Sequence, residues 1–211
     1  MENYDPIIHI CSSSEVYGQV QKGEVPINEN NQYRPASPYA IGKLGADMLA
    51  RWYYEEYGLK TIRTRMFTHT GPRRGDVFVV SAFAKQIAKI EKGLQEPILK
   101  VGNLESVRTF ADVRDTVHAY YLLTKHCKPG EAYNIGGNRT MKIREMLDIL
   151  LDFSPLKDKI KIELDPKLFR KTDVTYQIPD TSKFKNETGW DSPIPLEKTL
   201  EDTLNYWRKE I

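Results

Sequence analysis

A long helical pattern between two short apolar strands is the feature that most restricts how this chain can fold. Residues 39–57 carry apolar side chains three and four positions apart, which predicts a helix, and Gly58 follows as its C-cap. Residues 7–11 and 61–67, on either side, have the composition of strands. A strand, a helix and a second strand in this order predict parallel strands joined by a crossover helix.

The rest of the chain continues this alternation. We expect further helices at 79–90, 112–125, 141–153 and 196–207, and further strands at 97–101, 132–135 and 159–163. Polar or turn-rich stretches at 19–38 and 71–75 are predicted to be loops. The sequence shows no internal repeat, and its alternating elements predict an α/β fold.

Charge and hydropathy exclude several classes of partner. Lys and Arg number 31 against 29 Asp and Glu, a net charge of +2, which provides no field for binding nucleic acid. The apolar stretches are too short to cross a membrane, and the first residues do not resemble a signal peptide, so we expect a cytoplasmic protein. Cys11 and Cys127 have no further cysteines near them, so we predict free thiols and no metal site.

A tyrosine and a lysine at helical spacing are the first candidates for chemistry. Tyr39 and Lys43 would lie on one helix face, where an ammonium can lower the pKa of a phenol and let it act as a general acid or base. The alternative is an ordinary surface pair. Ser12 and Ser13 follow the strand at 7–11, so they would meet this pair at the carboxyl edge of the sheet. Serine, tyrosine and lysine together suit hydride transfer to a carbonyl.

Six segments extend this pattern over nearly the whole chain. They are Ser-Ser-Ser-Glu-Val-Tyr-Gly at 12–18, Ser-Pro-Tyr-Ala-Ile-Gly-Lys at 37–43, Arg-Met-Phe-Thr-His-Thr-Gly-Pro at 65–72, Val-Gly-Asn-Leu at 101–104, Val-Arg-Thr-Phe-Ala-Asp-Val-Arg-Asp at 107–115 and Tyr-Asn-Ile-Gly-Gly at 133–137. In this order they resemble the extended short-chain dehydrogenases/reductases that act on nucleotide sugars. Within that family the chain is most similar to the GDP-4-dehydro-6-deoxy-mannose reductases and their neighbours, the GDP-mannose 4,6-dehydratases.

The resemblance implies the carboxyl-terminal part of a doubly wound parallel, Rossmann-type sheet with a small α/β substrate lobe. Residues 1–69 and 111–136 would form a partial NAD(P)-binding domain, and 70–110 with 137–211 the nucleotide-sugar lobe. The 13 glycines include no glycine-rich phosphate turn, so we expect the first mononucleotide-binding half to be absent from this sequence. Members of the family form dimers through a helix bundle, which implies a homodimer that uses residues 39–57.

The resemblance also implies roles for individual residues. Catalysis would fall to Ser13, Glu15, Tyr39 and Lys43, with Glu15 as the base in a dehydratase or only a solvated loop residue. NAD or NADP would contact Ser12, Tyr39, Lys43, Met66, His69 and Arg74, although His69 and Arg74 also suit an ordinary loop. The GDP-hexose would contact Thr68, Lys85, Asn103, Arg108 and Arg170. Thr68 departs from the asparagine that is usual in the family, and Asn103 has a turn-capping role as its alternative.

Three functions remain open at this point. The first is reduction of C4 in a GDP-4-keto-6-deoxy-hexose by Ser13, Tyr39 and Lys43 with NAD(P)H. The second is dehydration of GDP-mannose: oxidation at C4, loss of water across C5–C6 with Glu15 as the base, and return of the hydride to C6. The third belongs to another class: a non-catalytic nucleotide-sugar-binding protein or a subunit that depends on a partner.

Overall fold

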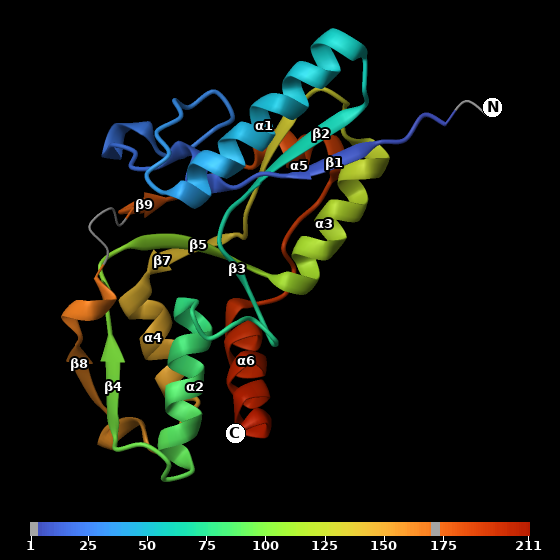
Figure 1. Cartoon of the computed structure of the whole chain (residues 1–211). Coiled ribbons are helices and arrows are strands. Elements are labelled where there is room, and N and C mark those ends of the chain that lie inside the picture. The colour runs from blue at the N-terminus through green and yellow to red at the C-terminus, as the bar shows by residue number, and fades with distance from the viewer. Residues whose placement is uncertain (1–3, 170–173) are drawn as a thin grey trace.

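The computed structural model describes residues 4–169 and 174–211, which form an upper and a lower part joined by short strands (Figure 1). The upper part contains a parallel sheet in the order β1 (Ile8–Cys11), β2 (Thr61–Met66) and β6 (Ala132–Ile135). Helix α1 (Pro38–Tyr57) connects β1 to β2. The expected parallel sheet with a crossover helix is therefore confirmed.

The two faces of β2 are covered by different elements. Ile62 and Met66 pack on one face with α3 (Val113–His126) and with Phe184 of α5 (Ser182–Thr188). Arg63 and Arg65 alternate with them and face α1. All six residues of β2 are buried, so the polar half of the alternation is covered by a helix rather than by solvent.

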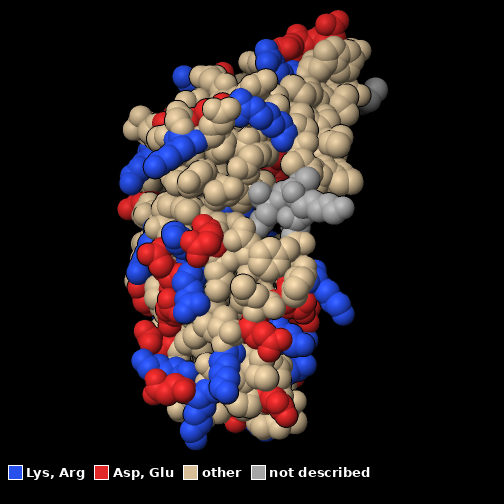
Figure 2. Space-filling model, turned by 90° about the vertical axis from the view of Figure 1, so that its left-hand side faces the viewer, with Lys and Arg blue, Asp and Glu red and all other residues tan. Residues whose placement is uncertain are grey.

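The lower part has a separate core. β4 (Ile98–Val101) and β8 (Lys161–Leu164) pair in parallel, and three helices pack beside them: α2 (Val79–Glu91), α4 (Ile143–Asp152) and α6 (Leu196–Glu210). Figure 1 shows these helices next to one another below the other strands. Figure 2 shows charged side chains of both signs interspersed over the lower half of one face. The upper half of this face has wider uncharged areas.

A small mixed sheet lies between the two parts (Figure 1). Its central strand is β5 (Val107–Asp112), which pairs in parallel with β3 (His69–Thr70) and β9 (Tyr176–Gln177) and antiparallel with β7 (Arg139–Lys142). This mixed sheet carries His69 and Arg108 of the predicted site.

The short 3-10 helices are η1 (Ser14–Tyr17), η2 (Lys22–Glu24), η3 (Lys157–Lys159) and η4 (Pro166–Leu168).

The sequence prediction is confirmed for the α/β class and wrong at two helix ends. The helix expected at 141–153 begins only at Ile143, because Met141 pairs with Arg108 and lies in β7. The helix expected at 196–207 continues to Glu210. β3, β5, β7, β9 and α5 were not predicted. Within residues 4–169 and 174–211, no helix combines the length and the apolar character needed to cross a membrane.

Candidate active site

The carboxyl end of β1 leads directly into two serines of the predicted site. Ser12 and Ser13 are both buried, and Ser13 is the N-cap of η1. Its Oγ accepts a hydrogen bond from the backbone N–H of Glu15 at 3.2 Å. The hydroxyl hydrogen of Ser13 is not used by this bond, so the side chain can still donate to a ligand oxygen. Glu15 itself is half-buried in the first turn of η1.

The first turns of α1 bring a tyrosine and a lysine to the same place. Ser37 starts the helix, because its Oγ accepts the N–H of Ala40 at 3.1 Å. The Nζ of Lys43 lies 5.7 Å from the ring centre of Tyr39 and donates to the carbonyl oxygen of Cys11 at 2.8 Å. Lys43 therefore ties α1 to the residue before Ser12. Tyr39 is 57% exposed, which leaves its phenol accessible to a substrate.

A histidine of β3, His69, lies beside Arg74 of the following loop, and Arg74 interacts electrostatically with Tyr39. The Nη1 of Arg74 lies 3.5 Å from Nε2 of His69, and the Arg74 guanidinium lies 3.6 Å from the ring centre of Phe78. Burial lowers the pKa of Arg74, opposed by the electrostatic effect of Tyr39. The Nε of Arg74 is buried and finds no partner among residues 4–169 and 174–211. A donor group there is available to a bound ligand.

His69 is held as a neutral side chain near neutral pH. Burial lowers the pKa of His69, and the nearby charge of Arg74 lowers it further, against the opposing effect of a backbone bond to Phe67. Its Nδ1 lies 3.2 Å from the carbonyl oxygen of Phe67. With Nδ1–H donating to Phe67, the neutral imidazole can accept a hydrogen bond at Nε2 without adding a second positive charge beside Arg74.

The predicted substrate residues are more widely distributed. Thr68 is half-buried, and its carbonyl accepts the N–H of Ala111 at 3.0 Å. Arg108 donates to the carbonyl oxygens of Val174 at 2.6 Å and Thr175 at 3.3 Å. Arg170 lies outside the described residues. Met66 is buried at the end of β2, where it pairs with Ile135 of β6.

Lys85 has partners in the lower part of the molecule. Its Nζ donates to Asp76 at 2.6 Å and lies 4.9 Å from the ring centre of Trp207. These contacts hold the ammonium on α2. The structure therefore does not bring Lys85 into contact with Tyr39 or Lys43.

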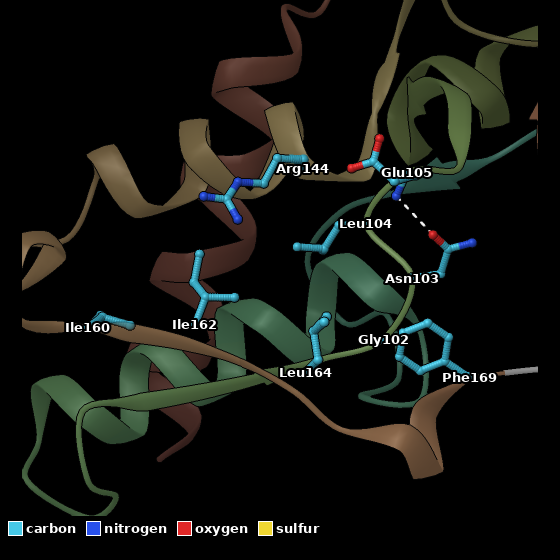
Figure 3. A pocket seen from close by; sticks show the side chains of 9 residues that line it. All are labelled: Gly102, Asn103, Leu104, Glu105, Arg144, Ile160, Ile162, Leu164 and Phe169. Carbon is cyan, nitrogen blue, oxygen red and sulfur yellow. Dashed lines mark hydrogen bonds between the residues drawn. The ribbon is translucent and has the colours of Figure 1, made fainter.

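Asn103 lines a pocket of about 640 Å³ in the lower part. Figure 3 shows Arg144 and Glu105 on one side of it and apolar side chains on the other. The pocket is lined by Gly102, Asn103, Leu104, Glu105, Arg144, Ile160, Ile162, Leu164 and Phe169. Asn103 accepts the N–H of Glu105 at 2.9 Å and donates to Ser106 at 3.1 Å. These contacts shape the loop between β4 and β5.

The donors gathered at the sheet edge fit the nicotinamide end of NAD or NADP. Tyr39, Lys43 and Arg74 supply hydroxyl, ammonium and guanidinium donors around the end of β1, and His69 adds an uncharged imidazole. The sequence contains no glycine-rich turn for the pyrophosphate. Among the residues that the structure describes, no three His, Cys, Asp or Glu side chains lie together as a metal site would require.

A buried ion pair below these residues was not predicted from the sequence. Asp47 of α1 and Arg65 of β2 are 0% and 1% exposed, and the Nε of Arg65 donates to Oδ2 of Asp47 at 2.9 Å. One signal was available: Asp47 falls in the apolar stripe of α1, three residues after Leu44 and three before Ala50. An acidic residue in such a position usually has a buried partner.

Known proteins similar to this chain share both its sequence and its fold. The family model described as GDP-mannose 4,6 dehydratase matches residues 3–203. GDP-6-deoxy-D-mannose reductase of Pseudomonas aeruginosa is 33% identical over 200 residues, which are 95% of this chain and 65% of the reductase. GDP-mannose 4,6 dehydratase 1 of Arabidopsis thaliana is 31% identical over 191 residues, 90% of this chain and 52% of the relative.

A solved structure extends the similarity to three dimensions. RMD from Pseudomonas aeruginosa, complexed with NADPH, superposes with a TM-score of 0.90 at 31% identity. The match covers 99% of this chain and 69% of that protein. The chain spans about half to two thirds of the length of the curated relatives it matches.

Proposed function

Since the chain belongs to the GDP-mannose 4,6-dehydratase family, we propose that it acts in the NAD(P)-dependent reduction of C4 in a GDP-4-keto-6-deoxy-hexose. The observation that carries this proposal is the contact of Lys43 with both Tyr39 and the carbonyl oxygen of Cys11. It supports a site in which a phenol and an ammonium lie near the serines that follow β1. The similarity to a reductase over 95% of the chain supports the direction of the reaction.

The residues of the site divide the work of such a reduction. Bound NAD(P)H supplies the hydride that adds to C4. Tyr39 donates the proton to the oxygen at C4, so the carbonyl becomes a hydroxyl and the phenol becomes a phenolate. Ser13 donates a hydrogen bond to the same oxygen and stabilises the charge that develops on it. The ammonium of Lys43 stabilises the phenolate until it is reprotonated from solvent.

His69 and Arg74 would hold the cofactor beside Tyr39, with Ser12 and Met66 on the sheet side. Thr68, Asn103, Arg108 and Arg170 would contact the nucleotide sugar, and arginines suit its phosphates because they donate two parallel hydrogen bonds. We propose that residues 1–69 and 111–136 form the NAD(P)-binding domain and that residues 70–110 and 137–211 form the lobe that binds the sugar nucleotide. Packing changes one of these boundaries: α5 contacts β6, so we include α5 in the NAD(P)-binding domain.

The test compares Tyr39→Phe with Tyr57→Phe in the full chain. Both tyrosines lie on α1 and are more than half exposed, but only Tyr39 has Lys43 beside it. With NAD(P)H and the 4-keto sugar nucleotide, we expect Tyr39→Phe to slow turnover by roughly 10²–10⁴-fold. Tyr57→Phe should keep the wild-type rate. Equal rates for Tyr39→Phe and the wild type would refute the assigned role.

Glu15 supports dehydration of GDP-mannose as the second candidate. It lies two residues after Ser13, in the same turn, where a carboxylate could remove a proton from C5 of the sugar. Incubation with GDP-mannose and NAD(P) separates the two reactions. A 4-keto product that disappears with Glu15→Gln would favour the dehydratase, whereas no product from GDP-mannose together with turnover of the 4-keto sugar nucleotide would favour the reductase.

A non-catalytic or partner-dependent protein is the third outcome. Calorimetry with a GDP-sugar, in the absence of NAD(P), measures binding separately from turnover. Tight binding of the GDP-sugar, without turnover in the reductase or the dehydratase assay, would favour a non-catalytic or partner-dependent protein over both enzymes.

We also propose that two copies of the chain associate through α1. The helix leaves an apolar face exposed, which consists of Ile41, Leu49, Trp52, Tyr53 and Tyr57. Sedimentation analysis should show a homodimer for the wild type and a monomer for Leu49→Lys. Val77→Lys, at an exposed position of the lower part, is the control and should leave the dimer intact. The cytoplasmic location expected from the sequence stays a prediction.

A further inference from the structure

We infer that the buried ion pair of Asp47 and Arg65 is the positioning element of the candidate active site. It would fix α1 along β2, and thereby bring Tyr39 and Lys43 to the carboxyl end of β1. The catalytic consequence rests on the proposed function, whereas the geometric consequence can be tested without it.

The pair joins the helix to the sheet through two parallel hydrogen bonds. Asp47 lies four residues after Lys43 and eight after Tyr39, so all three follow one side of α1. The Nε of Arg65 donates to Oδ2 of Asp47 at 2.9 Å, and its Nη2 donates to Oδ1 at 3.1 Å. Arg63 adds a longer bond to Oδ1 at 3.4 Å. A two-pronged contact restricts both position and orientation of the helix.

The same guanidinium also holds the turn that contains the catalytic serine. The Nη1 of Arg65 donates to the hydroxyl of Tyr17 at 3.0 Å, and the guanidinium lies 5.5 Å from the centre of that ring. Tyr17 is the last residue of η1, whose N-cap is Ser13. Nη2 further donates to the hydroxyl of Tyr33 at 2.6 Å. One buried side chain therefore contacts both elements that carry the catalytic residues.

Apolar packing alone gives α1 little to fix its position. Of its 20 residues only Ala40, Asp47 and Ala50 are buried. Leu44 is half-buried and packs against the core beside η1, whereas the two buried alanines are small and present no directional group, so a shift of the helix along its axis changes their packing little. The same shift breaks both bonds to Asp47. Arg65 keeps this carboxyl ionised, because its hydrogen bonds and charge hold the pKa of Asp47 below its usual range despite burial.

Chemical cross-linking measures the position of α1 directly. The thiol of Cys11 is exposed, and the Nζ of Lys43 is bound to the carbonyl of the same residue. A short reagent that couples a thiol to an amine should join Cys11 to Lys43, and mass spectrometry of the peptides gives the yield. Cys127 is buried and should not compete.

The decisive variant replaces the pair with apolar side chains, Asp47→Leu with Arg65→Met. Such exchanges often leave a protein as stable as before. Here Arg63 stays buried and loses its longer bond to Asp47, so the melting temperature of the variant is measured first. We expect the variant to fold but the cross-linking yield to fall by roughly tenfold, and kcat by roughly 10²-fold with little change in KM, since small displacements of catalytic groups have effects of this size.

A second ion pair provides the matched control. Arg34 donates to Glu24 through two bonds, both 2.7 Å, within the loop that follows η1. Glu24→Leu with Arg34→Met removes a similar pair that does not contact α1. The cross-linking yield and kcat should match the wild type.

Each result supports or overturns the inference. A folded Asp47→Leu, Arg65→Met variant with the wild-type yield would overturn it. If this variant does not fold, Arg65→Lys decides, because lysine keeps the charge but not the two-pronged contact. A lower yield at an unchanged melting temperature supports positioning, and an unchanged yield overturns it. If the wild type shows no turnover, the proposed function fails while the cross-linking result still stands.

Discussion

Helix α1 in the upper part and helices α2 and α6 in the lower part are stabilised in different ways. The residues that precede α2 and α6, Phe78 and Pro195, form no side-chain hydrogen bond that caps the helix. Both bury apolar residues in the lower core instead. α1 has Ser37 as its N-cap, and Gly58, with φ of 67°, ends it in the left-handed conformation that favours glycine.

This difference indicates that α1, unlike α2 and α6, depends on contacts other than the packing of its own apolar side chains in a core. α1 buries few of its side chains and leaves residues 51–60 exposed. The rings of Trp52, Tyr53 and Tyr57 lie on its surface and contact one another, with centres 5.1 to 5.7 Å apart. Contiguous exposed aromatic side chains are typical of surfaces that bind another polypeptide. The lower helices have no need of such a partner, because their apolar faces already meet in one core.

The largest expected effect comes from removing one charge of the buried pair in the upper part. Asp47→Asn should lower the free energy of unfolding by about 3–5 kcal/mol, because Arg65 is left buried without a counter-charge. Urea unfolding of the two proteins measures the difference. Glu24→Gln, at a partly exposed ion pair, should cost far less, because solvent screens this pair. Similar losses for both variants would mean that α1 is not held by this pair.

The second prediction compares two leucines on helices of the two parts. Leu147 of α4 is 0% exposed and Leu49 of α1 is 58% exposed. Leu147→Ala should cost about 2–5 kcal/mol of unfolding free energy, and Leu49→Ala within about 0.5 kcal/mol for the monomer. A larger loss for Leu49→Ala that grows with protein concentration would show that its face is buried in an assembly.

The parts of the fold that could be predicted are those with a strong local pattern. The spacing of apolar residues gives α1 and α2, and the short apolar run gives β1. β5, β7 and β9 could not be found this way, because pairing of distant residues creates them. Val107 meets both Lys142 and Tyr176, and none of these short segments has a strong pattern of its own.

The candidate site also contains some residues that could be predicted from the sequence and others that could not. The spacing of Tyr39 and Lys43 could be read from the sequence, as could the position of Ser13 at the end of a strand. The Asp47–Arg65 pair could not, because it depends on which face of β2 lies under α1. Lys85 is the opposite case. From the sequence we expect its ammonium to contact the GDP-hexose, whereas in the fold it donates a hydrogen bond to Asp76.

The third prediction concerns pH and affects only the upper part and its junction, since residues 79–107, 143–164 and 196–210 contain no histidine. Burial lowers the pKa of both His9 and His69 from the ordinary value of 6.5. The unfolded chain therefore takes up protons first as the pH falls. Their contribution to stability is complete above pH 6.5 and is lost as the pH falls from there toward the folded pKa values.

Urea unfolding at several pH values between about 7.5 and 5 measures this loss, which each histidine limits to about 1.4 kcal/mol per pH unit. Exchange of both histidines for glutamine should flatten the profile in this range. Hydrogen exchange should localise the weakening to β1 and β3. Equal weakening of α2 and α6 would show that the two parts unfold as one unit.

The smallest effect tests whether α1 is held by its own ends. Ser37→Ala removes the hydroxyl that accepts the N–H of Ala40, and should cost about 1 kcal/mol of unfolding free energy. Ser37→Thr keeps a hydroxyl and should cost less. The first turn of the helix carries Tyr39 and precedes Lys43, so Ser37→Ala should also reduce cross-linking of Lys43 to Cys11. A loss of stability without a change in cross-linking would mean that the ion pair at Asp47, rather than the cap, determines where the catalytic residues lie.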